Sequence, residues 1–161
     1  MITQWLGKSG LSLTIVYRAT KHGLNLDAFH RKLDGKRNLI YFVRSKPYGE
    51  VFGGFSSIKM TRPFEYYKHY PDPHAFIFSV TKGTKHEQIR KKDCKAVFHF
   101  SKEQLIGFGG GNDFYINENS DTINYSNSFF GRTQRPTRYS FTLPKGYEED
   151  SKEAQCYLGG A

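Results

Sequence analysis

The stretch that decides the fold is residues 105–116, which read LIGFGGGNDFYI. Its two ends, Leu105–Phe108 and Asp113–Ile116, are rich in apolar and aromatic residues and predict two short strands. The glycine run 109–111 lies between them. Glycines beside strands commonly mark a bend or a close approach of two backbone segments. An anion cradle made of backbone N–H groups is the alternative, and we favour the structural role.

Further strands are expected in the part of the sequence that precedes this stretch. Ala75–Val80 and Ala96–Phe100 are apolar runs of strand length, and Leu39–Val43 is a continuous apolar run expected to be buried on both faces. Residues 46–49, Lys-Pro-Tyr-Gly, predict a β-turn because Pro and Gly occupy its second and fourth positions. That turn is expected to join the strand at 39–43 to a second one at Glu50–Phe55, and residues 57–73 are expected to form a long loop.

The remaining segments add one helix and two strands. Residues 13–19 and 139–143 alternate between apolar and polar side chains, as strands do. Between Asn25, a suitable N-cap, and Gly35, a C-terminal stop, the apolar residues fall on one helical face. One helix followed by many short strands predicts the α+β class, mainly β and dominated by antiparallel sheet, in a single domain over residues 1–161.

The composition narrows the class of protein. The 161 residues include 24 Lys and Arg against 15 Asp and Glu, giving a formal net charge of +9. Aromatic residues make up 16%, which argues against disorder. No apolar run approaches the ~20 residues of a membrane span, and the N-terminal residues do not resemble a signal peptide. Two cysteines are too few for a disulfide framework, so we expect a reducing, cytoplasmic environment.

Three features of the sequence resemble ligand-binding sites, but their residues do not meet the requirements of such sites. Gly7-Lys8-Ser9 ends like a phosphate loop, but Ile2 stands where that motif needs its first glycine. Residues 117–128 begin like a calcium loop, but Thr122 and Ser128 replace the required Gly and Glu. The six histidines do not pair at zinc spacing. No catalytic residue, metal or cofactor is therefore predicted.

Two further function classes stay open as alternatives. Cys94 lies between Lys92 and Lys95, whose charges could lower its pKa, so Cys94 or Cys156 could serve a redox enzyme. The basic stretch 82–95 could bind nucleic acid, with aromatic side chains stacking on bases. However, the aromatic residues follow the alternation of strands, which favours core packing over nucleic-acid binding.

Several segments match one known family in the order in which they occur. The opening carries Tyr17-Arg18-Ala19, then His22-Gly23, then Phe29-His30 and Asp34-Gly35. The later segments are VFGGF at 51–55, AFIFSV at 75–80, FGGGNDFYI at 108–116, NYSN at 124–127, Gly131 and YLGG at 157–160. In this order, over nearly the whole chain, they resemble the TLDc domain family. His22 stands where the family usually has Asp.

The resemblance implies a fold of two antiparallel sheets packed as a sandwich, with a few helices at its margins. It implies no catalytic activity and no cofactor. It also implies a protein partner, the peripheral cytosolic part of a vacuolar-type proton ATPase, and a link to protection against oxidative stress. Family members normally finish with a further strand that would follow Ala161, so either the chain is a fragment or this strand is lost or supplied from elsewhere. If the strand is absent, one sheet edge is left open, which invites pairing with another chain. The alternative is a structural subunit of a larger assembly, held by that edge.

Candidate contact residues follow from their chemistry and expected exposure. They come from the aromatic loop 57–73, from the basic stretch 82–95 and from the end of the polar loop 117–135. The partner-binding candidates are Tyr66, Tyr67, Tyr70, Arg90, Lys91, Lys92, Lys95, Arg132, Arg135 and Arg138. The glycines expected to serve the fold are Gly53, Gly54, Gly109, Gly110 and Gly111.

Overall fold

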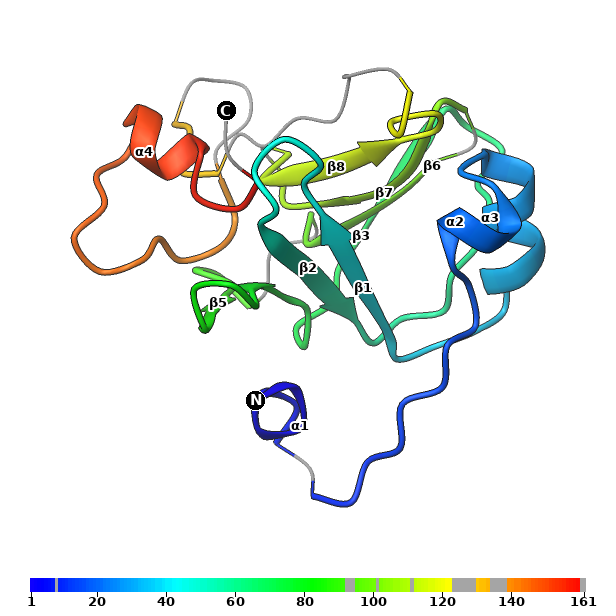
Figure 1. Cartoon of the computed structure of the whole chain (residues 1–161), viewed down its shortest axis with the longest axis horizontal. Coiled ribbons are helices and arrows are strands. Elements are labelled where there is room, and N and C mark those ends of the chain that lie inside the picture. Colours follow the sequence, from blue (N-terminus) through cyan, green and yellow to red (C-terminus); the bar gives the residue numbers. More distant parts are fainter. Residues whose placement is uncertain are drawn as a thin grey trace.

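Two four-stranded antiparallel sheets dominate the computed structural model of the chain (Figure 1). The structure describes residues 1–7, 9–91, 95–100, 102–110, 112–122, 130–133 and 139–159. The first sheet runs in the order β1 (Leu39–Arg44), β2 (Val51–Ser56), β4 (Phe76–Ser79) and β5 (Thr84–Glu87). The second runs in the order β3 (Tyr67–Tyr70), β6 (Val97–Phe100), β7 (Gln104–Phe108) and β8 (Phe114–Asn117). The helices of the described part are α1 (Ile2–Trp5), α2 (Ala19–His22), α3 (Leu26–Leu33) and α4 (Lys152–Gln155).

The two sheets pack face to face through aromatic rings, which confirms the predicted α+β, mainly β sandwich. The ring of Phe52 on β2 meets that of Phe114 on β8 edge-on, with 5.4 Å between centroids. Phe108 on β7 stacks on Phe114 and is fully buried. Its ring lies over Gly54, where a Cβ atom would come within 2.6 Å of it. A glycine at this position is therefore what lets the sheets approach so closely.

The helix expected after Asn25 is confirmed as α3. The Asn25 side chain caps it by accepting a hydrogen bond from the Ala28 N–H, at 2.9 Å. Phe29 and Leu33 face the core, and both are almost completely buried. Because Asn is a strong N-cap and the apolar residues share one helical face, local sequence alone specifies this element.

The hairpin over the 46–49 turn is also confirmed, but one detail of it was wrong. β1 pairs with β2 in register from Leu39↔Ser56 to Arg44↔Val51. The prediction buried the first strand on both faces, whereas β1 lies at the edge of its sheet and its Phe42 side chain is 51% exposed. An apolar run alone cannot distinguish a central strand from an edge strand.

Three other expectations need correction. Residues 13–18 form no strand, because they pair with no other strand in the described part of the chain. The expected loop 57–73 contains β3. The basic stretch 82–95, for which no element was predicted, contains β5. The predicted strand at 139–143 is reduced to a single bridge between Gln88 and Phe141. Alternating apolar and polar side chains mark a segment that can form a strand. Such a segment becomes a strand only where a neighbouring strand offers a free edge for pairing.

Candidate interaction surface

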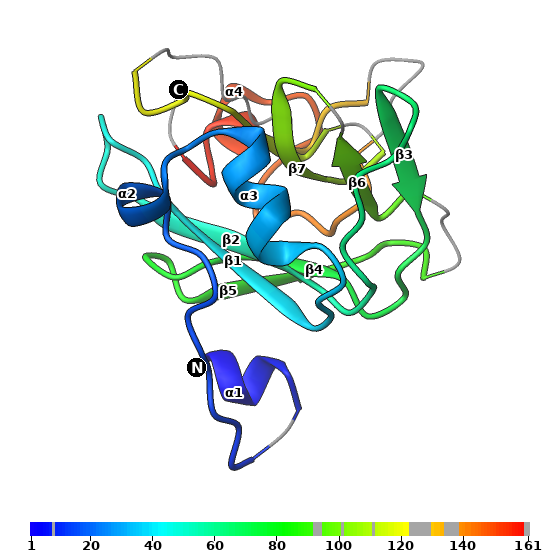
Figure 2. The same ribbon diagram turned by 90° about the vertical axis from the view of Figure 1, so that its right-hand side faces the viewer.

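β3 lies at the edge of the second sheet and carries two of the predicted contact residues (Figure 2). Its one strand partner among the described residues is β6, with Tyr67 opposite Phe100 and Tyr70 opposite Val97. On its other side β3 pairs with no strand of the described part of the chain, and an edge strand of this kind is a template for an added strand. Pro63 and Pro71 bracket the strand without interrupting it.

Exposed aromatic side chains gather at the start of β3. Phe64 is completely exposed, Tyr66 is 42% exposed and Tyr67 is 49% exposed. Tyr66 donates a hydrogen bond to the Glu103 carboxylate at 2.9 Å. Desolvation, reinforced by this bond and by the Glu103 charge, raises the pKa of Tyr66, so it remains a neutral donor at physiological pH.

The Tyr67 ring rests on an aromatic platform. It lies 6.1 Å from the Phe98 ring and 6.4 Å from the Phe100 ring, and these two rings are stacked nearly parallel on each other. His69 also packs on Phe98, at 3.9 Å between ring centroids. Tyr67 is therefore both exposed and held in place, which are the properties of an anchor residue at a protein interface.

The third predicted tyrosine has a different environment. Tyr70 is half-buried, its hydroxyl forms a 3.0 Å hydrogen bond with Thr61 Oγ1, and its ring lies 4.4 Å from that of His99. These contacts fix the end of β3 and tie it to the segment before it. Tyr70 thus packs beneath the surface, whereas Tyr66 and Tyr67 are exposed on it.

We expect acid to destabilise the protein through His99. Burial, reinforced by the charge of His30, lowers the pKa of His99 to about 4. In the unfolded chain this imidazole titrates near 6.5, so between these values the unfolded state binds a proton that the folded state does not. The free energy of unfolding should therefore fall as the pH drops through this window. The prediction is checked by measuring the free energy of unfolding of wild type and His99→Gln with denaturant across this pH range. The free energy of the variant should depend less steeply on pH than that of wild type. Equal pH dependence for the two proteins would contradict the role given to His99.

The predicted basic residues lie at the Tyr70 end of β3. Arg90, Lys91 and Lys95 are exposed and belong to the connection that leads into β6, whose first residue pairs with Tyr70. Arg132 is close to the same place: its carbonyl accepts from the Tyr139 N–H, and the next residue, Ser140, accepts from the Ile89 N–H. The candidates Lys92, Arg135 and Arg138 lie outside the described residues.

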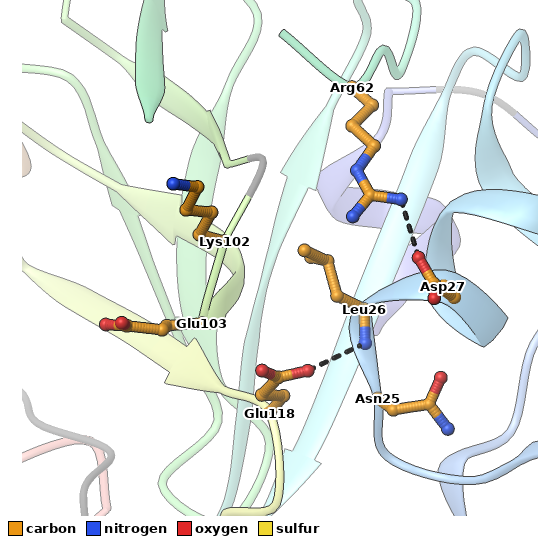
Figure 3. Close-up of a pocket in the computed structure, with 7 residues that line it drawn as sticks. All are labelled: Asn25, Leu26, Asp27, Arg62, Lys102, Glu103 and Glu118. Carbon is orange, nitrogen blue, oxygen red and sulfur yellow. Dashed lines mark hydrogen bonds and ion pairs between the residues drawn. The ribbon is translucent and has the colours of Figure 1, made fainter. Parts of the chain in front are cut away.

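A shallow polar cleft of about 450 Å³ lies at the other end of β3 (Figure 3). Its lining residues come from the start of α3, the segment before β3 and the ends of β7 and β8: Asn25, Leu26, Asp27, Arg62, Lys102, Glu103 and Glu118. Arg62 pairs with Asp27 at 2.6 Å, and Glu118 accepts from the Leu26 N–H at the start of α3. Glu103 joins the cleft to the aromatic residues, because it is also the acceptor of Tyr66.

The carboxylates of the cleft are engaged in contacts within the protein. Asp27 pairs with Arg62, Glu103 accepts from Tyr66, and Glu118 accepts from the N-terminus of α3. Among the described residues that line the cleft, none carries a hydroxyl, thiol or imidazole group. Within the described ranges, no three His, Cys, Asp or Glu side chains lie close enough together to hold a metal ion. Cys156 is a half-buried free thiol, and Cys94 lies outside the described residues.

Sequence reasoning found the aromatic and basic residues but missed the cleft. Arg62 and Asp27 are 35 positions apart, and Tyr66 and Glu103 are 37 apart. No local pattern connects such residues, because the sheet brings them together. Phe64, the most exposed aromatic side chain of the group, did carry a signal: it follows Pro63 in a segment with three tyrosines.

The predicted glycines occupy crowded positions. A Cβ atom on Gly109 would overlap the Asp113 carboxylate at 1.6 Å, and one on Gly110 would lie 3.1 Å from the Lys95 Cβ. The Gly110 N–H donates to the Ser140 hydroxyl at 2.8 Å, inside the protein. This N–H group is therefore used by the fold itself. Gly111 lies outside the described residues.

The chain is similar to a known protein family. The model of the family described as the TLDc domain matches residues 2–153 of the chain. The search of curated proteins gives no match. No helix in the described part of the chain is long and apolar enough to cross a membrane.

Proposed function

Because the chain belongs to the TLDc domain family, we propose that it is a non-enzymatic protein-interaction domain of the cytoplasm. The proposed partner is the peripheral, cytosolic part of a vacuolar-type proton ATPase. In this proposal the chain binds one assembly state of the pump more tightly than the other and shifts the equilibrium toward it, since a ligand acts on such an equilibrium only through differential affinity. Protection against oxidative stress would follow from this control.

The observation that carries the proposal is the composition of the β3 surface, defined here by Arg62, Phe64, Tyr66, Tyr67, Arg90, Lys91, Lys95 and Glu103. Exposed aromatic side chains lie in its middle, with basic residues at one end and a charged cleft at the other. Aromatic and Arg residues are enriched at protein interfaces, with charged groups at the rim. The net charge of +9 would speed encounter with an acidic partner.

The proposal is tested by recovering the partner from cells. The tagged chain is incubated with nuclease-treated native lysate at near-physiological salt, and the bound proteins are identified by mass spectrometry. Proton-pump subunits among the specific partners support the proposal. Recovery of a different complex in stoichiometric amounts would overturn it.

Replacing Tyr67 by Ala is expected to weaken binding to the pump's peripheral sector about tenfold or more, because a truncated anchor residue typically costs over 1–2 kcal/mol. The fold should tolerate the change, since Tyr67 is half exposed. Tyr48→Ala is the matched control, because Tyr48 is similarly exposed, at 54%, but lies in the β1–β2 turn. Surface plasmon resonance with the purified sector measures both variants, and equal affinities for the two would contradict the assignment of the surface.

A structural subunit of a larger assembly is the second candidate. The edge positions of β1 and β3 favour it, since each could accept a strand from a neighbouring subunit. An obligate subunit should aggregate without its partner, whereas a regulator should be monomeric when purified alone. Sedimentation of the isolated chain separates the two.

A further inference from the structure

Residues 151–158, called the C-terminal segment here, contain α4 and lie at one end of the sandwich (Figure 1). α4 is a single turn of four residues, too short to hold its shape in isolation. Tyr157 and Leu158 are buried and belong to the core between the sheets. The segment is therefore held by its contacts with the body of the protein rather than by its own helix.

A chain of hydrogen bonds joins this segment to β5. The hydroxyl oxygen of Tyr157 lies 2.9 Å from Thr84 Oγ1, and Thr84 Oγ1 lies 3.0 Å from His86 Nε2. On the other side of the imidazole, His86 Nδ1 lies 2.8 Å from the carbonyl oxygen of Thr142. His86 is 2% exposed and Tyr157 is 5% exposed, so the chain of hydrogen bonds lies inside the protein.

The chemistry of these groups fixes the direction of each hydrogen bond when His86 is neutral. The Thr142 carbonyl can only accept, so His86 Nδ1 carries the proton and Nε2 is the acceptor. Thr84 donates its one hydroxyl proton to Nε2 and accepts in turn from Tyr157. Each of these protons then has an acceptor.

A second proton on His86 disrupts this arrangement. Both ring nitrogens then donate, so Thr84 accepts from Nε2 and turns its own proton toward the Tyr157 oxygen. The Tyr157 proton is left without a second acceptor among the described residues. An unsatisfied buried donor and a buried imidazolium both cost free energy. Protonation of His86 therefore penalises the structure in which the segment is in place.

The groups packed against the imidazole carry no charge. The rings of Phe130 and Tyr157 meet it edge-on, at 5.1 and 5.4 Å between centroids, and Ile77 lies opposite it on β4. Burial in these surroundings lowers the pKa of His86 below 6.5, although the hydrogen bond to the Thr142 carbonyl acts in the other direction. The closed structure therefore holds the neutral imidazole.

The nearest charged side chains do not offset the penalty of a second proton. Lys82, in the turn before β5, donates to the Tyr157 carbonyl at 2.6 Å, and its ammonium group lies 4.7 Å from the centre of the Tyr157 ring. Glu50 pairs with Lys82 at 3.3 Å. Lys85 and Glu87 pair with each other on the opposite face of β5. An added positive charge would thus lie near an existing one, whose carboxylate partner is already engaged.

We propose that His86 is an acid-sensitive latch for the C-terminal segment. At neutral pH its hydrogen bonds keep the segment closed over the end of the sandwich, and protonation releases the segment while the two sheets stay folded. Tyr157 packs 6.2 Å from the Phe130 ring, and a Cβ atom on Gly159 would lie 3.1 Å from the Phe52 ring. Release therefore uncovers aromatic rings of the core. This latch is independent of the β3 surface and of the proposed pump partner.

The test is amide hydrogen exchange of the full chain at about pH 7.5 and about pH 5.5, read by mass spectrometry on peptides from the C-terminal segment and from β7. After correction for intrinsic exchange rates, protection of the segment should fall by up to about tenfold at the lower pH. An opened imidazole with a pKa of 6.5 binds its proton about that strongly there. Peptides from β7 should stay more protected than the segment at both pH values.

A variant that cannot gain the proton tests the role of His86 directly. In His86→Gln the side-chain amide can donate to Thr142 and accept from Thr84, but it does not titrate in this range, so the segment should lose its pH dependence. His74→Gln is the matched control, because His74 is exposed, and it should respond to acid as wild type does. An equal fall of protection in wild type and folded His86→Gln would overturn the proposal, as would a wild-type segment equally protected at both pH values.

Tyr157→Phe provides a second variant if His86→Gln is not folded by circular dichroism. It keeps the buried ring and removes the hydroxyl that joins the segment to Thr84. Protection of its C-terminal segment should therefore be lower than that of wild type at neutral pH and should depend less on pH. The full pH dependence of wild type in this variant would overturn the proposal.

Discussion

Replacing Gly53 by alanine is expected to lower the free energy of unfolding by about 3 kcal/mol or more, as severe overpacking of a core does. Gly53 lies on β2, between β1 and β4. An added Cβ atom would lie 1.8 Å from the Tyr41 carbonyl oxygen and 2.8 Å from the Phe78 ring. The oxygen belongs to the backbone of the neighbouring strand, so it can move only if the β1–β2 ladder is distorted.

Urea unfolding measures this loss, and Gly49→Ala is the control. Gly49 lies in the turn of the same hairpin with open space around it, but at a φ of +68°. Its replacement should cost only about 1 kcal/mol, the strain of a left-handed conformation in an L-residue. Similar small losses for both variants would show that the strands can separate locally, which would contradict the close pairing of β1 with β2.

Replacing Asp72 by alanine should cost about 3–5 kcal/mol, because it leaves several buried donors without their acceptor, at about 1–3 kcal/mol for each unsatisfied group. Asp72 is completely buried. Its two carboxylate oxygens accept hydrogen bonds from the hydroxyl of Ser56, the N–H and hydroxyl of Ser57, and the N–H of His74. These bonds tie the end of β2 to the connection between β3 and β4, and so join the two sheets.

Asp72→Asn separates charge from hydrogen bonding in the same experiment. Its amide keeps one oxygen acceptor, so it should lose less stability than Asp72→Ala does. Asp27→Ala removes an exposed carboxylate paired with Arg62, and it should change stability by at most about 1 kcal/mol. If Asp72→Ala behaved like Asp27→Ala, the buried hydrogen-bond cluster would have no role in holding the sheets together.

The parts of the fold that the sequence predicts are those specified by neighbouring residues. The cap of α3 and its first hydrogen-bonded turn depend on Asn25 and Ala28, three positions apart. The β1–β2 hairpin depends on Pro47 and Gly49 within a four-residue turn. In both cases the local preference and the tertiary structure agree, which is why the expectation was confirmed.

The missed elements depend on distant partners. β3 and β5 contain Tyr, Lys and His rather than an apolar run, and they form because β6 and β4 offer them an edge. Residues 13–18 show the converse, since their alternation is strand-like but they remain unpaired in the described part. Likewise, Asp72 gives no local signal, because its partners gather only when the sheets pack.

The residue types of the candidate surface could be predicted from the sequence, but their arrangement in space could not. Tyr66, Tyr67 and the basic residues stand out by composition alone. That they gather at one edge of the second sheet follows only from the pairing of β3 with β6, and the hydrogen bond of Tyr66 to Glu103 follows only from the approach of β7. Tyr70 could not be separated from its neighbours by sequence, because its contact with His99 is tertiary.

The most direct test of the proposed function is the affinity of the purified chain for the detached peripheral sector of a vacuolar-type proton ATPase, compared with its affinity for the assembled pump. Isothermal titration calorimetry of wild type and of Tyr67→Ala compares the two assembly states with each other and the variant with wild type. We predict that wild type binds the two assembly states with clearly different affinities, and that Tyr67→Ala loses affinity for the preferred state. Equal affinities for both states, or no binding of folded wild type to either, would contradict the account.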